Sequence, residues 1–235
     1  GGDKPLTEQA QLWRPGSRDI VWDRVVTKIE GSKVTVDAPI TTAIEQRFGG
    51  ASLRKYNWPG RVSQVGIENM TLDTTFEKDN PVDEAHSWVG ITMENAENAW
   101  VRQVEFRHFS GGAVQIWETC KYVTVEDCKS LEPVSENGGF RRHTFLTGGQ
   151  MTLFLRCWSE NGRHDFTTWH CAAGPNAFVW CQAQNALEDS GPMFSWASGV
   201  LFDNVKIDGA RLNLMNRLIQ NAGVGWAAAN CMLWN

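Results

Sequence analysis

The sequence FVWCQA, at Phe178–Ala183, repeats the pattern of FLRCWS, at Phe154–Ser159, which begins 24 residues earlier. In both stretches the first and fourth residues are apolar, the third is polar or aromatic, and the last is small or apolar. Five more stretches share the pattern: Ile67–Leu72, Val101–Phe106, Val125–Ser130, Phe202–Ile207 and Ala228–Leu233. The fourth residues of all seven stretches lie at 70, 104, 128, 157, 181, 205 and 231, in steps of 34, 24, 29, 24, 24 and 26 residues.

This spacing predicts a solenoid. A short β-favouring stretch that recurs about every 24 residues is typical of a repeat that buries its inner face only against neighbouring repeats. Helical repeats would show amphipathic runs of about ten residues or more, and the sequence has none. About 24 residues suffice for three short strands and three turns. We therefore predict an all-β fold, a parallel β-helix of about seven rungs over residues 61–235.

Equivalent positions of stacked rungs lie above one another, about 4.8 Å apart. The fourth residues are thus expected to form one inward-facing ladder: Met70, Val104, Cys128, Cys157, Cys181, Val205 and Cys231. Its cysteines are expected to be buried thiols, because free cysteine packs as a small apolar residue. A disulfide between Cys157 and Cys181 stays open as an alternative, since neighbouring levels lie within bonding range.

Residues 1–60 do not carry the repeat. Alternating strands are expected within Asp19–Glu30 and Lys33–Asp37, joined by a turn at Gly31 and Ser32, in a hairpin that caps or leads into the solenoid. The other end has no polar cap, because the chain stops at Asn235, inside or just after a repeat. We expect the chain to be truncated at its C-terminus, with the remaining C-terminal part of the protein or another chain covering that open end.

Composition excludes several classes of function. The chain has 22 Lys and Arg against 27 Asp and Glu, so its net charge is 22 − 27 = −5, which argues against nucleic acid as a partner. No run of about 18 apolar residues is present, so no membrane span is expected. The first residues form no apolar signal core, so a signal peptide is absent from this chain. The six cysteines lack zinc-site spacing, so no metal site is expected.

Positions counted from the ladder suggest a catalytic cluster. Five to eight residues after Cys157 the chain reads Gly-Arg-His-Asp, and the same offsets after Cys181 end in Glu188 and Asp189. His164 is therefore expected about one level from Glu188, and Asp165 one level from Asp189. A histidine beside carboxylates can act as a general base, and paired carboxylates raise one pKa. The alternative is a turn stapled by the ion pairs of His164 and Arg163, which is otherwise a candidate for binding substrate.

Counting backward by 14 residues from the ladder gives a second column, with His143, Thr167, Gly191 and Arg217 on successive rungs. Together with the preceding residue Arg142, this column predicts a cationic face that binds a carboxylate- or sulfate-bearing substrate through Arg142 and Arg217. His143 is a second candidate base. A solvated face with no function is the alternative.

Three tryptophans fall in turns outside the repeated stretches. An exposed indole can stack on the apolar face of a sugar ring, so these residues are candidate substrate platforms. Packing at the ends of the rungs is the alternative for each of them. They are Trp169, Trp196 and Trp226.

Taken together, these residues resemble the pectin-lyase-like right-handed parallel β-helix proteins of bacterial polysaccharide degradation, especially largely uncharacterised secreted members. The stretches that carry the resemblance are Trp13–Arg24, Val34–Pro39, Gly162–Phe166, Gly174–Asn176, Asp189–Pro192 and Gly225–Asn230. The resemblance implies a right-handed coil, a secreted or periplasmic place, and a polysaccharide or oligosaccharide bound along the solenoid. Pectate lyases of this kind hold calcium through a column of aspartates. Because the chain has no such column, no cofactor is expected, although calcium stays possible.

Three functions follow. The first is a polysaccharide lyase for an acidic, uronate-containing polymer, with Arg142 and Arg217 on the carboxylate and His143 or His164 removing the neighbouring proton. The second is a glycoside hydrolase whose carboxylate pair is Glu188 with Asp165 or Asp189. The third is a non-catalytic β-helix that binds glycans through its tryptophan and arginine side chains.

Overall fold

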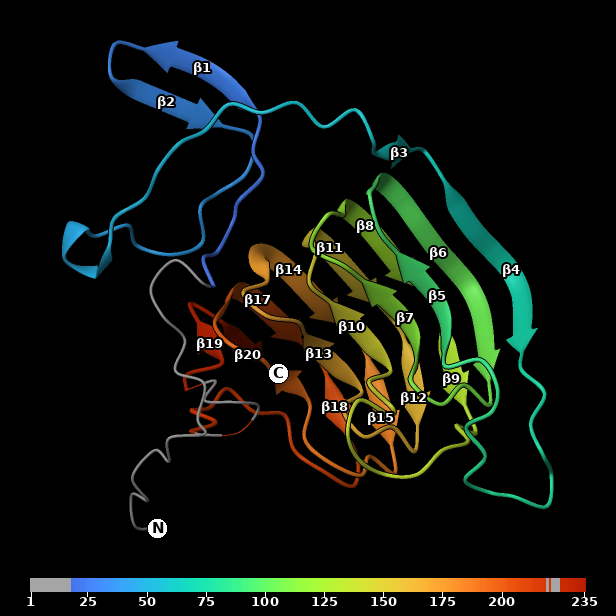
Figure 1. Cartoon of the computed structure of the whole chain (residues 1–235). Coiled ribbons are helices and arrows are strands. Elements are labelled where there is room, and N and C mark those ends of the chain that lie inside the picture. Colours follow the sequence, from blue (N-terminus) through green and yellow to red (C-terminus); the bar gives the residue numbers. More distant parts are fainter. Residues whose placement is uncertain (1–17, 219, 221–224) are drawn as a thin grey trace.

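The computed structural model describes residues 18–218, 220 and 225–235. The chain is all-β, as predicted, with a 13-stranded, a five-stranded and a two-stranded sheet. Figure 1 shows the strands of the two large sheets stacked along one axis, and their printed pairings are all parallel. This arrangement is compatible with the predicted solenoid. No helix of the described part is long and apolar enough to cross a membrane.

The strands divide among the three sheets as follows. The two-stranded sheet contains β1 (Val26–Glu30) and β2 (Lys33–Val36), and the short 3-10 turn η1 covers Gln46–Phe48. The five-stranded sheet contains β5 (Val89–Met93), β7 (Gly112–Ile116), β10 (Phe145–Thr147), β13 (Phe166–Thr168) and β16 (Gly191–Pro192). The 13-stranded sheet contains β3 (Val62–Ser63), β4 (Gly66–Asp73), β6 (Ala96–Arg107), β8 (Lys121–Glu126), β9 (Lys129–Leu131), β11 (Gln150–Leu155), β12 (Trp158–Glu160), β14 (Ala173–Val179), β15 (Gln182–Gln184), β17 (Ala197–Asp203), β18 (Lys206–Ile207), β19 (Ala228–Ala229) and β20 (Met232–Trp234).

The central part of the ladder is confirmed. The residues that follow its members pair in parallel register, since Lys129 pairs with Trp158, Trp158 with Gln182, and Gln182 with Lys206. The ladder residues of these rungs are buried and share one level each: Val104, Cys128, Cys157, Cys181 and Val205. All six cysteines of the chain are free thiols, so the disulfide between Cys157 and Cys181 is not formed.

The two ends of the ladder were predicted wrongly. Met70 pairs in register with Val104, but it is 44% exposed, because β4 lies at the end of the stack. Cys231 does not follow Val205: Met232 pairs with Leu201, which puts Cys231 at the level of Val200. The last repeat is therefore displaced along the rung relative to the others.

A left-handed backbone conformation explains this displacement. Asn204 and Asn230 both have a positive φ, of 52° and 50°, a conformation that asparagine tolerates better than most residues. Asn204, however, occupies the corner between β17 and β18, whereas Asn230 lies level with Gly199 at the start of β17. Because two different corners use the same kind of residue, their sequences look alike.

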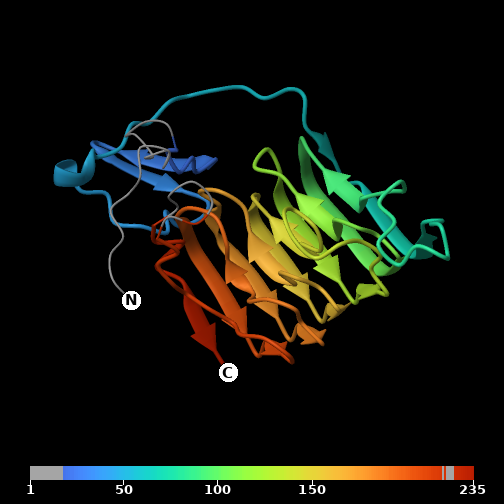
Figure 2. The ribbon, with the colours of Figure 1, turned by 60° about the horizontal axis from the view of Figure 1, so that its bottom comes forward.

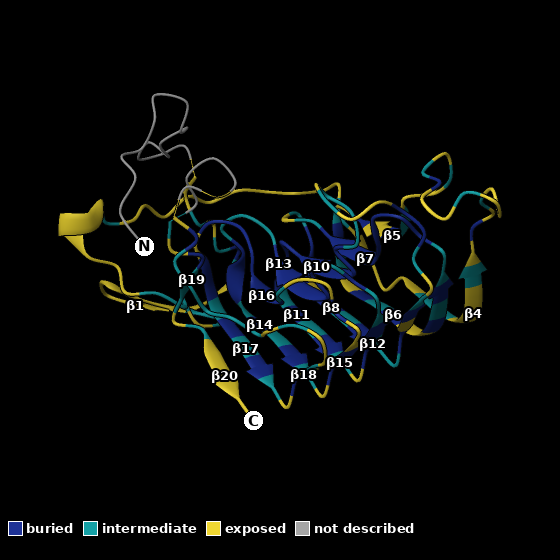
Figure 3. Cartoon of the chain, turned by 90° about the horizontal axis from the view of Figure 1, so that it is seen from below, coloured by how far each residue is buried: buried dark blue, intermediate teal, exposed yellow. Residues whose placement is uncertain are grey.

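Aromatic side chains fill the interior on successive levels. The rings of Phe154 and Phe178 are stacked with centroids 4.7 Å apart, and those of Phe178 and Phe202 are 5.0 Å apart. All three residues are fully buried. Figure 3 shows this buried interior running through the central strands, with exposed residues at β4, β20 and β1. The stack gives the sheets one continuous core, which no single rung provides.

The predicted hairpin is also confirmed, since β1 and β2 pair antiparallel around Gly31 and Ser32. Every residue of β1 is exposed, and Figure 2 shows the hairpin outside the two large sheets. The proposed division into residues 1–60 and 61–235 stays a prediction. Of the N-terminal stretch that carries the family resemblance, Trp13 to Ser17 lie outside the described residues.

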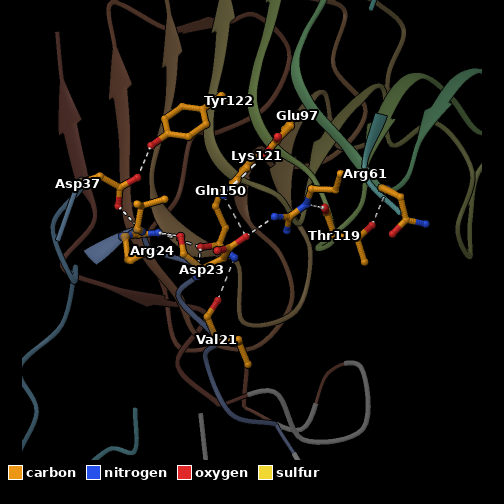
Figure 4. A network of polar contacts seen from close by, with 12 residues as sticks. Val21, Asp23, Arg24, Asp37, Arg61, Glu97, Thr119, Lys121, Tyr122 and Gln150 are labelled. Carbon is orange, nitrogen blue, oxygen red and sulfur yellow. Dashed lines mark hydrogen bonds and ion pairs between the residues drawn. The ribbon is translucent and has the colours of Figure 1, made fainter. Parts of the chain in front are cut away.

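A buried ionic network anchors the segment that precedes the hairpin (Figure 4). The carboxylate of Asp23 contacts the guanidinium of Arg61 and lies 3.3 Å from Lys121 Nζ, and all three side chains are less than a tenth exposed. The side-chain oxygen of Gln150 accepts hydrogen bonds of 2.9 Å from the Asp23 amide and from Arg24. Because the charges in this network compensate one another, we interpret it as a structural anchor.

The ladder yields a stability prediction. Replacing Cys157 by serine is expected to lower the free energy of unfolding by about 1–3 kcal/mol, because a hydroxyl is costlier than a thiol to bury in an apolar slot. Cys128 and Cys181 are expected to resist alkylation in the native protein, and burial raises the pKa of Cys128 to about 11. Denaturant unfolding and timed thiol labelling check both statements, with the half-buried Cys171→Ser as the control. Rapid native labelling of the ladder thiols would contradict the assigned register.

Candidate functional site

A cleft of about 830 Å³ lies over the turns that surround β13 and β16. Six of the residues predicted for the site line it: His143, Arg163, His164, Glu188, Asp189 and Arg217. Further lining residues include Phe140, Phe194, Met193, Met215, Arg211 and Asn213. The cleft thus combines titratable side chains with an apolar and aromatic wall, as small-molecule sites do.

Parallel pairing places the first two candidates as the sequence predicted. Phe166 leads β13, and its amide donates to the Ser190 side chain on the next rung, so His164 and Glu188 occupy equivalent levels two residues earlier. His164 Nε2 lies 3.5 Å from Glu188 Oε2. Arg163 donates from Nε to the other oxygen of Glu188, at 2.9 Å. The predicted proximity of His164 and Glu188 is therefore present.

The imidazole of His164 is oriented by the main chain. Its Nδ1 lies 2.7 Å from the main-chain oxygen of Asp189, an arrangement in which Nδ1 carries the proton and donates it. The residue is 3% exposed, and this burial lowers the pKa of His164 below its usual range. Nε2 then holds a lone pair at neutral pH, so the contact with Glu188 is not a permanent ion pair.

Asp189 is the centre of a second group. Its carboxylate accepts from Arg217 at 2.5 Å and from the amide of Asn213 at 3.3 Å. Burial would raise the pKa of Asp189, but the hydrogen bond and charge of Arg217 outweigh that effect and hold the pKa below its usual value. Asp189 is therefore a carboxylate at neutral pH.

His143 forms the aromatic side of the cleft. Its ring stacks on Phe140 at 4.6 Å and lies 4.7 Å from the ring of His164. Burial lowers the pKa of His143 to about 3, so this imidazole is neutral in the folded protein. Its Nδ1 is buried and has no hydrogen-bond partner among the described residues.

Asp165 does not join the cluster. Successive side chains of a strand point to opposite faces, so Asp165 points inward where His164 points outward. Its Oδ1 accepts from the hydroxyls of Ser159 and Thr144, and its Oδ2 has no partner among the described residues. Burial raises the pKa of Asp165 to about 6. A carboxylate pair of Asp165 with Asp189 across the cleft is therefore absent.

The predicted cationic column was also placed wrongly. Thr167 pairs with Leu146 and with Gly191, so His143 lies three residues away from their level. The step from Phe145 to Phe166 is 21 residues, whereas the ladder step on the same rungs is 24, because the turns differ in length from rung to rung.

Arg142 is absent from the cleft lining. Its guanidinium donates to the hydroxyl of Ser135 at 2.9 Å, to the main-chain oxygen of Ser135 at 2.7 Å, and to that of Asn161 at 3.2 Å. These bonds fasten the segment around Ser135 to the next rung. The guanidinium is therefore occupied by structural contacts.

The three tryptophans have different surroundings. Trp169 packs against Trp117 and Phe194, with centroids 5.1 and 4.5 Å apart, and so supports the aromatic wall from behind. Trp196 and Trp226 are about half exposed and neighbours, since the Trp196 amide donates to the Trp226 oxygen at 3.3 Å. Neither lines the cleft, and their role as sugar platforms stays a prediction.

Arg211 is the cleft residue that sequence reasoning missed. It is exposed and makes no ion pair among the described residues, unlike Arg163 and Arg217. The Ser190 amide donates to the Arg211 main-chain oxygen, which puts this arginine beside the rung of Asp189. A signal existed, because Arg211 lies six residues after the ladder residue Val205, within the offsets that identified His164.

No group of three or more histidine, cysteine or acidic side chains in the described part of the chain is placed to hold a metal ion. The dependence on calcium stays open as a prediction.

Asp165 yields a prediction about pH. The folded-state pKa, about 6, lies above the ordinary value of 3.8, so neutral Asp165 adds stability below pH 3.8 that is lost as the pH rises through 6. Asp165→Asn should therefore gain stability relative to the parent protein at pH 8 compared with pH 3.5, by up to about 3 kcal/mol. Denaturant unfolding at both pH values measures this difference, with Asp203→Asn as the control. An equal effect at the two pH values would contradict the assignment.

Comparison with known proteins gives no relative. No protein family, curated protein or solved structure matches the chain. The functional argument therefore rests on the geometry of the cleft.

Proposed function

We propose that the chain is a right-handed parallel β-helix that acts outside the cytoplasm as a lyase on an acidic, uronate-containing polysaccharide. The cleft is the binding site in this proposal, and His164 is its general base. The observation that carries the proposal is a neutral, oriented imidazole beside cationic side chains in one cleft.

The base is supported by its hydrogen bonding. His164 donates from Nδ1 to the Asp189 main chain, which leaves the Nε2 lone pair available for a proton. A lowered pKa keeps this nitrogen unprotonated at neutral pH. A base of this kind can remove the proton on the carbon next to a carboxyl group, provided that the negative charge that develops is stabilised.

That stabilisation is assigned to arginine. Arg211 is exposed, lines the cleft and has no ionic partner among the described residues, so its guanidinium is available for a uronate carboxylate. Arg163 adds positive charge beside Glu188. In the reaction, His164 Nε2 takes the proton from C5, the electron pair forms the C4=C5 double bond, and the glycosidic oxygen leaves C4 and is protonated by solvent.

The cleft favours elimination over hydrolysis. A hydrolase of this chain would need a pair of carboxyl groups on either side of the scissile bond, one as acid and one as base or nucleophile. Asp165 points into the core, and the carboxylate of Asp189 is occupied by Arg217 and Asn213. Only Glu188 then remains available, which is one carboxyl group short of that mechanism.

The assay follows the ultraviolet absorbance of the unsaturated product during digestion of a panel of uronate polysaccharides. We expect His164→Ala to reduce the rate by about 10²-fold or more, with a nearly unchanged melting temperature, because it removes the base but no core contact. His108→Ala is the control, since His108 lies outside the cleft and pairs with Asp73 and Glu132.

Two results would overturn this function. New reducing ends without ultraviolet absorbance would identify a hydrolase. Binding of the polymer without any cleavage would identify a glycan-binding protein. Full activity of a folded His164→Ala variant would retain the lyase but move the base to another residue.

A further inference from the structure

Arg217 lines the cleft but is almost completely buried, at 4% exposure. Its side chain donates from Nε to the main-chain oxygen of Pro192 at 3.1 Å and from Nη2 to the Asp189 carboxylate. These contacts differ from those expected of a residue that binds the substrate carboxylate. Both the charge and the directed donors of Arg217 are spent within the protein.

Asp189 connects Arg217 to His164. Its carboxylate is held by Arg217 and Asn213, and its main-chain oxygen accepts the proton of His164 Nδ1. A carboxylate fixed from one side restrains the short peptide segment that carries it. The position of the main-chain oxygen therefore depends on the ion pair with Arg217.

Two acceptors compete for the single proton of the neutral imidazole. The main-chain oxygen of Asp189 lies 2.7 Å from Nδ1, and the carboxylate of Glu188 lies 3.5 Å from Nε2. A neutral histidine carries its proton on one nitrogen only, so a bond to Asp189 leaves Nε2 bare, and a bond to Glu188 covers it. Arg163 and His143 are the other titratable groups that face this ring.

We infer that Arg217 is a positioning residue, which holds Asp189 so that the proton of His164 stays on Nδ1 and Nε2 stays open to the cleft. The inference deepens the proposed function, because it rests on His164 as the base, and it gives Arg217 a different role from the substrate contact predicted from the sequence. Without Arg217, Asp189 is released, the proton moves to Nε2 facing Glu188, and the base is lost.

The test compares Arg217→Met with Arg211→Met. Both variants remove a guanidinium from the same cleft, but only Arg217 is in contact with Asp189. The tautomer of His164 is read from the ¹⁵N chemical shifts of the ring nitrogens in histidine-labelled protein, with the His164 signals assigned by their loss in His164→Gln. We expect protonated Nδ1 in the parent protein and in Arg211→Met, and protonated Nε2 in Arg217→Met.

Kinetics give a second readout. With a polymer that the parent protein cleaves, we expect Arg217→Met to lower kcat by about tenfold or more with little change in KM, and Arg211→Met chiefly to raise KM. Asp189→Asn keeps the main-chain oxygen but weakens the pair with Arg217, so it should move the tautomer in the same direction. If Arg217→Met does not fold, Asp189→Asn and Arg217→Lys carry the test.

Retention of the Nδ1 proton in folded Arg217→Met, or in both substitute variants, would overturn the inference. The tautomer measurement needs no substrate, so it also separates the two proposals. If the proton moves as expected while the parent protein cleaves no uronate polymer, the positioning role stands and the proposed function fails.

Discussion

The parallel register between rungs is the constraint on which the rest of the structure depends. Main-chain hydrogen bonding fixes each strand one level above its predecessor, so every side chain must fit the side chains at its own position above and below. Phe154, Phe178 and Phe202 satisfy this requirement by stacking on one another, and Cys128, Cys157 and Cys181 satisfy it as small buried thiols. The same register brings His164 next to Glu188 across 24 residues of sequence.

The sequence predicted those features of the fold that repeat along the chain with a constant step. The ladder from Val104 to Val205 was predictable because the corner that precedes it has the same length on each rung. The level of Cys231 was not, since Asn204 and Asn230 occupy different corners with the same left-handed conformation. Composition does not distinguish two corners that need the same backbone geometry.

The candidate site was predictable to the same extent. His164 and Glu188 follow the ladder at a fixed offset, and they meet as expected. The inward direction of Asp165 follows from strand alternation, which offset arithmetic alone does not include. Arg217 and Phe140 come from segments whose length varies between rungs, so spacing did not place them. Contacts that depend on an irregular turn require the three-dimensional structure.

These irregular turns share one location. The additional residues of the long steps lie between β4 and β5, between β9 and β10, and between β18 and β19, always at the passage that leads out of the 13-stranded sheet. The last two of these segments supply Phe140, Arg211 and Arg217 to the cleft. Insertions and deletions at this corner change the cleft without disturbing the stacked core. The architecture therefore separates the parts that must be inherited unchanged from those in which new specificities can evolve.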